Sequence, residues 1–375
     1  MQHPNVLTGN NIAGKRALVI GFNDKDIKSG LENLDELKSL VRTLKINIVH
    51  SILIRHPDSV HPATYIGKGK IQEVYEIIGA YNCELVIFEK ELTPIQQRNL
   101  ENFLKVIVID RTGLILLIFG SNAHTLEGKL QVELAQTTYL LPRLADSYGH
   151  LSRLGGTIGT RGPGEQKLEV YRRKARQRIR FLNMKIKEIE KHRNLIFQSR
   201  QRKNFPLAAV VGYTNVGKST LLNALIHRQE AFVDNKLFST LDPLTRLVYL
   251  DQTHFCLMSD TVGLLFSLPH HLIAAFRATL EELIFADVLV CLIDPVGVSL
   301  KKQMATIETV LEMMGIQQKP RLNVFNKIDL LDQTELNMLK TDYPDSVFIS
   351  ARADYGLNDL RIKIAEIIGE HVYFK

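Results

Sequence analysis

A glycine-bracketed octapeptide at residues 212–219, with the sequence Gly-Tyr-Thr-Asn-Val-Gly-Lys-Ser, constrains this chain more than any other feature. It follows an apolar run at 207–211 and opens a run with helical spacing at 220–225. A strand, a glycine loop and a helix start are the context in which this pattern cradles phosphate groups. Gly212 and Gly217 allow the backbone to curl so that successive N–H groups point at phosphate oxygens. The octapeptide therefore predicts a nucleotide-binding domain of the P-loop type.

The last two residues of the octapeptide supply the polar chemistry of the loop. The Lys218 ammonium can neutralise the β- and γ-phosphates, and the Ser219 hydroxyl can ligate Mg²⁺. The positive end of the following helix adds to the attraction for phosphate. A glycine-rich turn formed by chance is the alternative, and the flanking strand and helix make it the weaker interpretation.

Three further motifs follow the loop, each directly after an apolar, strand-like run. Asp-Thr-Val-Gly at 260–263 places an acid for Mg²⁺ at a strand end, and its glycine N–H can meet a γ-phosphate. Asn-Lys-Ile-Asp at 326–329 ends in Asp329, whose carboxylate can accept hydrogen bonds from guanine N1–H and the 2-amino group. Adenine lacks these donors and would leave the carboxylate unpaired. Ser-Ala-Arg at 350–352 has backbone groups that can reach guanine O6.

The order of these motifs along the chain is the order that a guanine-nucleotide domain requires, so we predict such a domain. Asn326 would brace the base-binding loop, and Lys327 would lie over the base. A P-loop kinase or ATPase is disfavoured because Asp329 selects guanine.

The segment 238–246 lies between the phosphate loop and the Asp-Thr-Val-Gly motif and is a candidate switch. A switch needs a threonine whose hydroxyl meets Mg²⁺ and whose backbone meets the γ-phosphate. Thr240 and Thr245 are both candidates for this role.

The residue after Gly263 bears on the rate of hydrolysis. Many GTPases carry glutamine there to orient the attacking water, whereas this chain has Leu264. An apolar side chain cannot orient water, so we predict slow hydrolysis by the isolated protein. The missing group would come from a partner or from a rearranged switch. Asn215 suggests a further hypothesis, that the loop holds a K⁺ ion whose charge acts as an arginine finger would.

Residues 1–120 are predicted to form a small α/β domain with a largely parallel sheet covered on both faces. Strands are predicted at 17–20, 46–49, 85–88 and 106–109, and helices at 30–44 and 69–81. Two polar patches stand out, at 64–70 and 92–100. The first is either an anion-binding glycine loop or a turn and helix cap with solvated lysines, and we favour the turn and cap.

A pair of long antiparallel helices is predicted next, at 122–154 and 165–202, with a kink or break at Pro142. The loop between them, 155–164, contains five glycines and a proline. This composition excludes a helix or a packed strand. The loop is therefore a plain linker or a flexible probe that reaches a partner.

The second helix of the pair carries the basic charge of the chain. The net charge is +7, but residues 167–203 contribute 14 Lys and Arg against three acids, which leaves the remainder acidic. Charge of a single sign costs self-repulsion unless a polyanion is nearby. We therefore predict a surface that faces nucleic acid. A solvated face and a membrane-surface helix are the alternatives, and the sparse apolar stripe disfavours the membrane.

The whole chain is predicted to be α/β: a P-loop GTPase domain with a mostly parallel sheet, preceded by a small α/β domain and the helical pair. The predicted segments are 1–120, 121–203, 204–369 and a short tail at 370–375. The cysteines lie in apolar runs and are predicted to be buried free thiols in a reducing cytosol: Cys83, Cys256 and Cys291. The N-terminus lacks the layout of a signal peptide. We expect a cytoplasmic monomer with no integral membrane segment.

These motifs together resemble those of one family, the HflX-type translational GTPases. The most specific mark is Arg-Gly-Pro-Gly-Glu at 161–165. The switch sequence Thr-Leu-Asp-Pro also matches, and the resemblance favours Thr240 over Thr245 as the Mg²⁺ ligand. Further matching stretches are those at 65–70, 97–100, 110–115, 127–136 and 260–263.

The resemblance implies a cytoplasmic GTPase that associates with the large (50S) ribosomal subunit and splits or rescues stalled ribosomes under stress. The helical pair with its glycine loop would insert toward ribosomal RNA near the peptidyl-transferase region. The N-terminal domain of the family is also linked with ATP binding, for which residues 1–120 contain no independent phosphate-loop motif. The chain departs from the family at Gln166, where threonine is usual, and at Leu264, where phenylalanine is usual.

Motifs and resemblance together give the predicted site. The residues predicted to act in catalysis are Lys218, Thr240 and Gly263. Mg²⁺ is predicted to bind Ser219 and Thr240, and K⁺, if present, Asn215. The predicted GTP-binding residues are Gly212, Tyr213, Thr214, Asn215, Val216, Gly217, Lys218, Ser219, Thr220, Phe238, Ser239, Thr240, Leu241, Asp242, Asp260, Thr261, Val262, Gly263, Asn326, Lys327, Ile328, Asp329, Ser350, Ala351 and Arg352. The predicted RNA-facing residues are Gly155, Gly156, Arg161, Gly162, Arg172, Arg173 and Lys174.

The predicted function is GTP hydrolysis coupled to binding of the large ribosomal subunit. The alternative is an RNA- or ribosome-binding module in which GTP is a regulatory ligand with negligible turnover. Leu264 keeps this alternative open, and ribosome-stimulated turnover separates the two.

Overall fold

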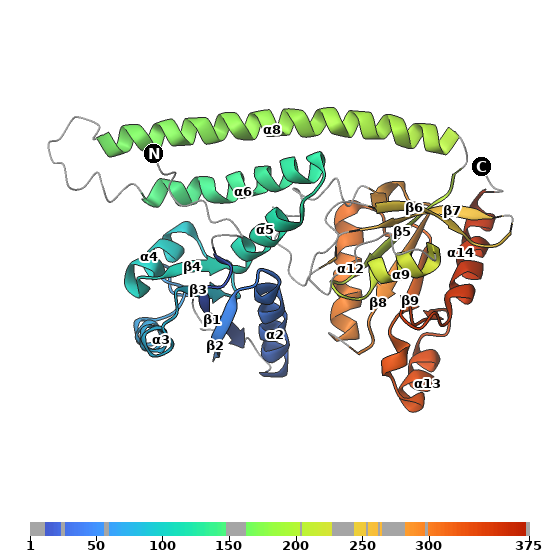
Figure 1. Ribbon diagram of the computed structural model, residues 1–375, viewed down its shortest axis with the longest axis horizontal. Coiled ribbons are helices and arrows are strands. Elements are labelled where there is room, and N and C mark those ends of the chain that lie inside the picture. Colours follow the sequence, from blue (N-terminus) through green and yellow to red (C-terminus); the bar gives the residue numbers. More distant parts are fainter. Residues whose placement is uncertain are drawn as a thin grey trace. The chain divides into compact units, whose positions relative to one another are not determined.

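The protein forms two compact units in the computed structural model, and both draw on two stretches of the chain (Figure 1). The first unit comprises Met1–Ser121 and Lys129–Ile186, and the second comprises Asn122–Gly128 and Lys187–Lys375. The structure describes residues 12–23, 27–55, 60–147, 163–202, 205–226, 244–252, 254–261, 263–264, 282–296 and 299–372.

A four-stranded sheet in the order β2-β1-β3-β4 forms the centre of the first unit, and all its pairings are parallel. Its strands are β1 (Arg16–Asn23), β2 (Asn47–Arg55), β3 (Leu85–Phe88) and β4 (Ile107–Asp110). Strand β3 is buried along its whole length, as expected for an inner strand of a parallel sheet with both faces covered. The predicted small α/β fold is confirmed.

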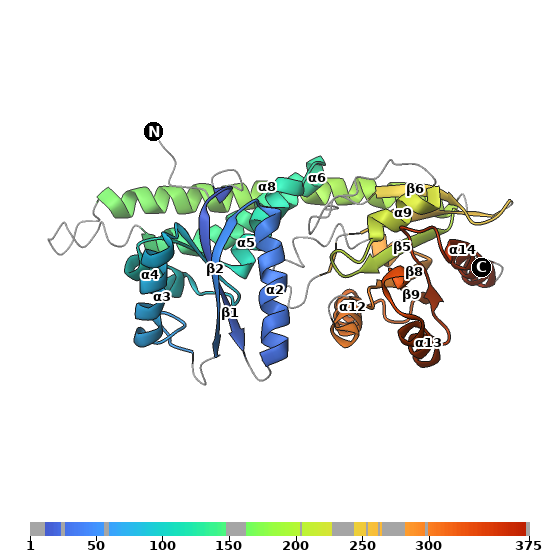
Figure 2. The same cartoon turned by 60° about the horizontal axis from the view of Figure 1, so that its bottom comes forward.

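Helices cover both faces of this sheet (Figure 2). Helix α2 (Ile27–Thr43) lies on one face, while α3 (Lys68–Tyr81) and α4 (Pro94–Leu104) lie on the other. The polar patch at 92–100 is the start of α4, where Thr93 and Gln96 form a reciprocal capping box. The glycine-rich patch at 64–70 is a turn that leads into α3, and this helix has no side-chain cap.

Two long helices, α6 (Leu126–Ser147) and α8 (Pro163–Arg202), run antiparallel and side by side (Figures 1 and 2). In the first unit, Leu182 and Ile186 of α8 are buried, and Arg178 forms a two-pronged ion pair with Glu133 of α6 at 2.6 and 2.7 Å. The Arg178–Glu133 ion pair therefore links the two helices. Residues 155–162 of the predicted glycine loop lie outside the described residues. Pro163 and Gly164 already belong to α8, so the predicted end of the loop at 164 is wrong by two residues.

The sequence predicts a kink or a break at Pro142. Helix α6 continues through this proline to Ser147, so the break is excluded, while a kink stays a prediction. Proline removes one backbone donor from the helix ladder. The next residue, Arg143, donates from its guanidinium to the carbonyl of Tyr139 at 3.0 Å. The side chain of Arg143 thus adds a hydrogen bond within the turn that the proline weakens.

A buried carboxylate joins the sheet of the first unit to helix α6. Asp110 ends β4 with no exposed surface, and α5 (Arg111–Asn122) begins at the next residue. Its oxygens accept hydrogen bonds from Leu92 N at 3.0 Å, Gly113 N at 2.7 Å, the Tyr139 hydroxyl at 2.7 Å and Arg143 Nη2 at 3.2 Å. Burial raises the pKa of Tyr139 well above its usual value, and the Asp110 charge adds to the rise. The phenol therefore stays protonated and remains a donor.

Substituting Asp110→Asn should destabilise the first unit by about 3 kcal/mol, because Arg143 would lose its buried counter-charge and an amide N–H₂ would face donors. Urea denaturation followed by circular dichroism measures the loss. Asp35→Asn is the matched control, since the Asp35 side chain is 74% exposed and pairs only at the surface, with Lys38. The control should stay within about 0.5 kcal/mol of the parent. Equal stability of the two variants would contradict the role given to Asp110.

The second unit contains a six-stranded sheet in the order β10-β9-β8-β5-β7-β6. Only the β6–β7 pairing is antiparallel among the described strands. The strands are β5 (Leu207–Gly212), β6 (Leu244–Tyr249), β7 (Phe255–Asp260), β8 (Val288–Ile293), β9 (Arg321–Phe325) and β10 (Val347–Phe348). The mostly parallel sheet predicted for this region is confirmed.

The helices of the second unit follow the parallel strands. Those described after the parallel strands include α9 (Lys218–Ile226), α12 (Leu300–Met314), the short 3₁₀ turn η1 (Ile328–Leu330), α13 (Gln333–Asp342) and α14 (Leu357–Val372). A core from β5, β8, β9 and α12 fills one face of the sheet. No described helix is long and apolar enough to cross a membrane.

The three cysteines are buried and free, as predicted. Burial raises the pKa of Cys256 and of Cys291 to about 12. Because the thiolate is the reactive form, these side chains act as small apolar core residues.

Candidate functional site

The octapeptide forms the loop between β5 and α9, and its two glycines are required by geometry. A Cβ at Gly212 would overlap the backbone carbonyl oxygen of Leu292 on the neighbouring strand β8. Gly217 has φ +96°, and a Cβ there would collide with the side-chain amide of Asn326. The loop can therefore follow this path only with glycine at both positions. Helix α9 starts at the next residue, so its positive end faces the loop.

Lys218 is buried, and in this structure its ammonium is held by the loop itself. The Nζ atom donates to the carbonyl of Gly212 at 3.2 Å and to that of Tyr213 at 2.8 Å. Burial lowers the pKa of Lys218 to about 8, and the nearby Asp260 charge opposes this. A phosphate oxygen would offer this cation a full negative charge in place of two carbonyl dipoles.

Ser219 and Asp260 come together although 41 residues separate them. The Ser219 hydroxyl donates to Asp260 Oδ2 at 2.5 Å, and the carboxylate is almost fully buried at the end of β7. The adjacent Thr261 hydroxyl donates to the carbonyl of Val210 at 2.6 Å and fixes the start of this loop to β5. A hydroxyl and a carboxylate are oxygen ligands of the kind that Mg²⁺ prefers, so the pair fits that ion.

The side chain of Asn326 connects its own turn to two other loops. Its Nδ2 donates to the carbonyl of Val216 at 2.8 Å, and its Oδ1 accepts from Ala351 N at 2.9 Å. The amide therefore links the phosphate loop to the Ser-Ala-Arg loop. Because the Ala351 N–H is engaged with Asn326, it is not directed at a ligand in this conformation.

Lys327 and Asp329 lie in the same turn but differ in their surroundings. Lys327 has φ +64°, and its ammonium donates to the carbonyl of Asn215 at 2.7 Å. Asp329 lies in η1 and is exposed. The carboxylate is thus accessible to a base, and the lysine spans from the base-binding turn to the phosphate loop.

Gly263 and Leu264 lie against the phosphate loop. Leu264 N donates to the carbonyl of Gly212 at 3.0 Å, and Thr214 N donates to the carbonyl of Leu264 at 2.9 Å. A Cβ at Gly263 would stand 3.2 Å from Lys218 Nζ. The side chain of Leu264 is packed in the apolar core of the unit. It therefore cannot take part in chemistry at the loop.

Some predicted residues lie elsewhere or outside the described ranges. Thr245 lies within β6 opposite Ser259, and its hydroxyl donates to Glu282 at 3.4 Å. On α8, Arg172 is partly exposed and Arg173 and Lys174 are exposed. The predicted site residues outside the described ranges are Gly155, Gly156, Arg161, Gly162, Phe238, Ser239, Thr240, Leu241, Asp242 and Val262.

Sequence reasoning missed Asp294, which follows β8 directly and receives the Lys327 ammonium at 2.6 Å. A signal was present in the sequence. An acid stands immediately after an apolar strand here, just as Asp260 ends the strand β7.

Comparisons with known proteins cover nearly the whole chain. The family profile described as "GTP-binding GTPase N-terminal" matches residues 31–120, "GTP-binding GTPase Middle Region" matches 122–200, and "50S ribosome-binding GTPase" matches 207–327. GTPase HflX of Caldanaerobacter subterraneus subsp. tengcongensis is 46% identical over 88% of this chain and 75% of its own length. This chain belongs to the HflX family of GTPases.

Other members agree with this assignment. GTPase HflX of Escherichia coli is 38% identical over 96% of this chain and 84% of its own length. A crystal structure described as a complex of SsGBP with GDP matches with a TM-score of 0.53 and 24% identity, over 95% of this chain and 99% of that one. This structural likeness supports the fold of the HflX-family chain.

The affinity of this HflX-family protein for GDP should fall as the pH rises through about 8. Below that pH Lys218 is already charged, so the affinity should stay level. Above it a proton must be taken up with the nucleotide, so each further pH unit should weaken binding by up to about tenfold. Titration with a fluorescent GDP analogue between pH 7 and 9 measures the profile. A level affinity across this range would show that the empty loop keeps Lys218 fully charged.

Proposed function

We propose that this chain hydrolyses GTP to GDP and phosphate in the cytoplasm and acts, as a monomer, on the large (50S) ribosomal subunit to split or rescue stalled ribosomes under stress. One observation carries the proposal. The phosphate loop, the Ser219–Asp260 pair that fits Mg²⁺ and the base-binding turn at 326–329 lie together at one edge of the second sheet. The 50S ribosome-binding description of the profile that matches 207–327 supports the partner.

In this proposal Asp329 recognises the guanine base. Its exposed carboxylate would accept from guanine N1–H and the 2-amino group, and a base without these donors would leave the charge unpaired. The alkyl stem of Lys327 would cover one face of the base. Asn326 would contribute indirectly, because both ends of its amide already bridge protein loops.

Ser219 would ligate Mg²⁺ directly, Asp260 would do so through water, and Thr240 is proposed as the second direct ligand. The bound ion supplies Lewis-acid charge to the β- and γ-phosphate oxygens. On nucleotide binding the Lys218 ammonium would exchange the carbonyls of Gly212 and Tyr213 for phosphate oxygens. The Gly263 N–H would meet the γ-phosphate, because Gly263 lies beside the Lys218 ammonium that would bind the same group.

Hydrolysis by the isolated protein should be slow. The side chain that would orient water in many GTPases is replaced by Leu264, and this leucine is packed in the core. Lys218 and the metal ligands stabilise charge on the transferred phosphoryl group, but they do not position the attacking water. We therefore assign the activating group to the ribosome or to a rearranged switch that contains Thr240.

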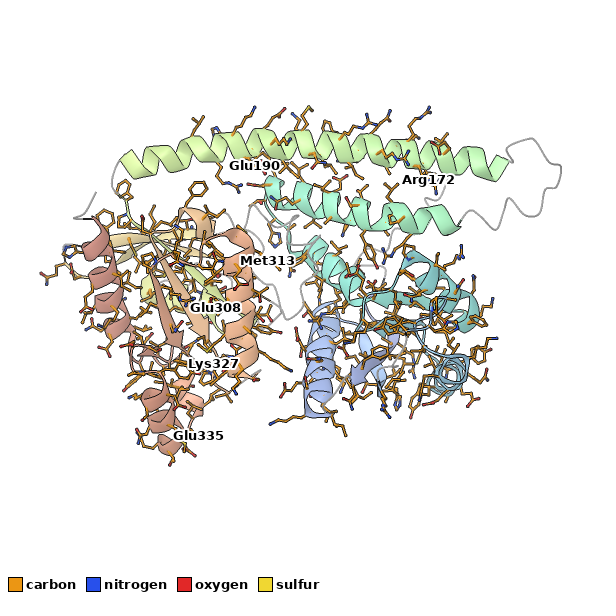
Figure 3. The ribbon with its side chains drawn as sticks, turned by 180° about the vertical axis from the view of Figure 1, so that it is seen from behind. Arg172, Glu190, Glu308, Met313, Lys327 and Glu335 are labelled. Carbon is orange, nitrogen blue, oxygen red and sulfur yellow. The ribbon has the colours of Figure 1, made fainter. Side chains whose placement is uncertain are left out.

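RNA contact is assigned to the helical pair. Helix α8 carries exposed basic side chains at Arg173 and Lys174, beside the partly exposed Arg172 (Figure 3). Counter-ion release from phosphate groups would supply most of the affinity for ribosomal RNA. The glycine loop 155–164 is proposed to reach the RNA beyond the end of this helix.

A second candidate function is a ribosome-binding module in which GTP is a regulatory ligand with negligible turnover. The core position of Leu264 favours this candidate, since it removes the usual water-orienting group. Guanine-nucleotide binding is common to both candidates, so turnover is the property that separates them.

Steady-state GTP hydrolysis with and without purified large ribosomal subunits, in K⁺ buffer, tests the proposal. We expect a rise of about tenfold or more, because a partner that supplies the activating group adds at least ~1.4 kcal/mol of transition-state stabilisation. Tight GTP binding without any rise would support the regulatory-ligand candidate.

Replacing K⁺ by Na⁺ should lower the rate of hydrolysis if the Asn215 side chain helps to hold a K⁺ ion beside the phosphates. Asn215 has φ +62°, a conformation that glycine adopts without strain, so Asn215→Gly removes the side chain while keeping the loop path. We expect Asn215→Gly to abolish the difference between the two buffers. Identical rates of the parent protein in K⁺ and Na⁺ would refute the K⁺ hypothesis.

A further inference from the structure

We propose that Asp294 is a positioning residue for guanine-nucleotide binding, because its carboxylate holds the Lys327 ammonium between the phosphate loop and the base-binding turn. This inference rests on the proposed placement of guanine beside Lys327 and Asp329. It adds to that site a residue which contacts no nucleotide and acts through the lysine.

The contacts of Lys327 carry the inference. Its Nζ atom lies 2.6 Å from Asp294 Oδ2 and 2.7 Å from the carbonyl oxygen of Asn215. The Asp294 side chain is 11% exposed and that of Lys327 is 26% exposed, so water screens the pair only in part. The lysine is therefore fixed at its ammonium end by one charged and one neutral acceptor.

Asp294 is itself held from a second element. Gln303 of α12 is buried, and its side-chain amide forms two hydrogen bonds with the backbone of Asp294. Its Oε1 accepts from Asp294 N at 3.0 Å, and its Nε2 donates to Asp294 O at 2.7 Å. The other carboxylate oxygen of Asp294 accepts from Val296 N at 3.0 Å. The backbone and the side chain of Asp294 are thus both held by contacts that do not involve Lys327.

Fixing a lysine in advance matters for binding. A lysine side chain has several rotatable bonds and loses much rotamer freedom when one geometry is imposed. Asp294 imposes that geometry through contacts within the protein, so the nucleotide does not have to order the side chain itself. Because Lys327 also holds the Asn215 carbonyl, the same ion pair fixes the middle of the phosphate loop.

Removing the carboxylate should therefore weaken nucleotide binding and speed nucleotide release. We expect Asp294→Ala to lower the affinity for GDP by roughly tenfold or more, and Asp294→Asn, which keeps an oxygen acceptor for Lys327, to lower it less. Stopped-flow release of a fluorescent GDP analogue and equilibrium titration measure both quantities. Asp287→Asn is the matched control, because Asp287 stands at the other end of β8 and accepts from Leu207 N.

A double-mutant cycle with Lys327→Ala separates positioning from a merely structural role. If Asp294 acts through Lys327, then adding Asp294→Asn to Lys327→Ala should change GDP affinity by less than about twofold. It should also raise the melting temperature above that of Lys327→Ala alone, since the single variant removes the Lys327 ammonium from a buried carboxylate. An Asp294 effect of the same size in both backgrounds would overturn the inference.

Asp329→Asn distinguishes failure of this inference from failure of the proposed site. This variant should lose affinity for GDP and gain relative affinity for xanthosine diphosphate, whose 2-oxo group accepts a hydrogen bond from the new amide. If Asp329→Asn behaves so while both Asp294 variants bind GDP like the parent, only the positioning role is wrong. If Asp329→Asn leaves GDP affinity unchanged, the proposed placement of guanine is wrong.

Discussion

The parallel pairing of β5 with β7 and β8 decides where the polar groups of the second unit lie. Gly212 pairs with Leu292, Val210 with Asp260, and Ile293 with Phe325 of β9. Because parallel strands end at the same edge, the phosphate loop and the motifs after β7, β8 and β9 emerge side by side. The apolar faces of these strands fix the register, so the side chains that bind one another at this edge are set by core packing.

Sequence reasoning succeeded where chemistry demands a fixed spacing. The octapeptide, the acid at 260 and the base-binding turn at 326–329 were found because each joins an apolar strand to a loop of defined composition. The parallel sheet of the first unit followed from the alternation of apolar runs and helical spacing, whereas the order of its strands came only from the structure. Local rules were sufficient for these features.

Contacts between distant polar side chains could not be predicted in this way. The four groups that donate to Asp110 come from positions 92, 113, 139 and 143, and nothing in their local sequence indicates a common acceptor. Helix α6 continues through Pro142, and Arg143 of the same cluster contributes a hydrogen bond beside it, which local sequence did not indicate. The Asp294–Lys327 pair likewise arises from the packing of β8 beside β9. Both units thus use a buried polar group at a strand end to fix neighbouring segments, and only the structure identifies the partners.

The position of Leu264 limits how this chain can be re-engineered. Its side chain fills part of the core, and its backbone is paired on both sides with the phosphate loop. Glutamine at this position would bury a polar amide at a cost of about 1–3 kcal/mol and would leave the amide far from any water at the loop. Grafting a glutamine therefore does not create a self-sufficient catalyst on this scaffold. If a partner supplies the activating group, as proposed, the chain could hydrolyse GTP independently only after a change in the path of its backbone beyond Gly263, which a single substitution at position 264 does not provide.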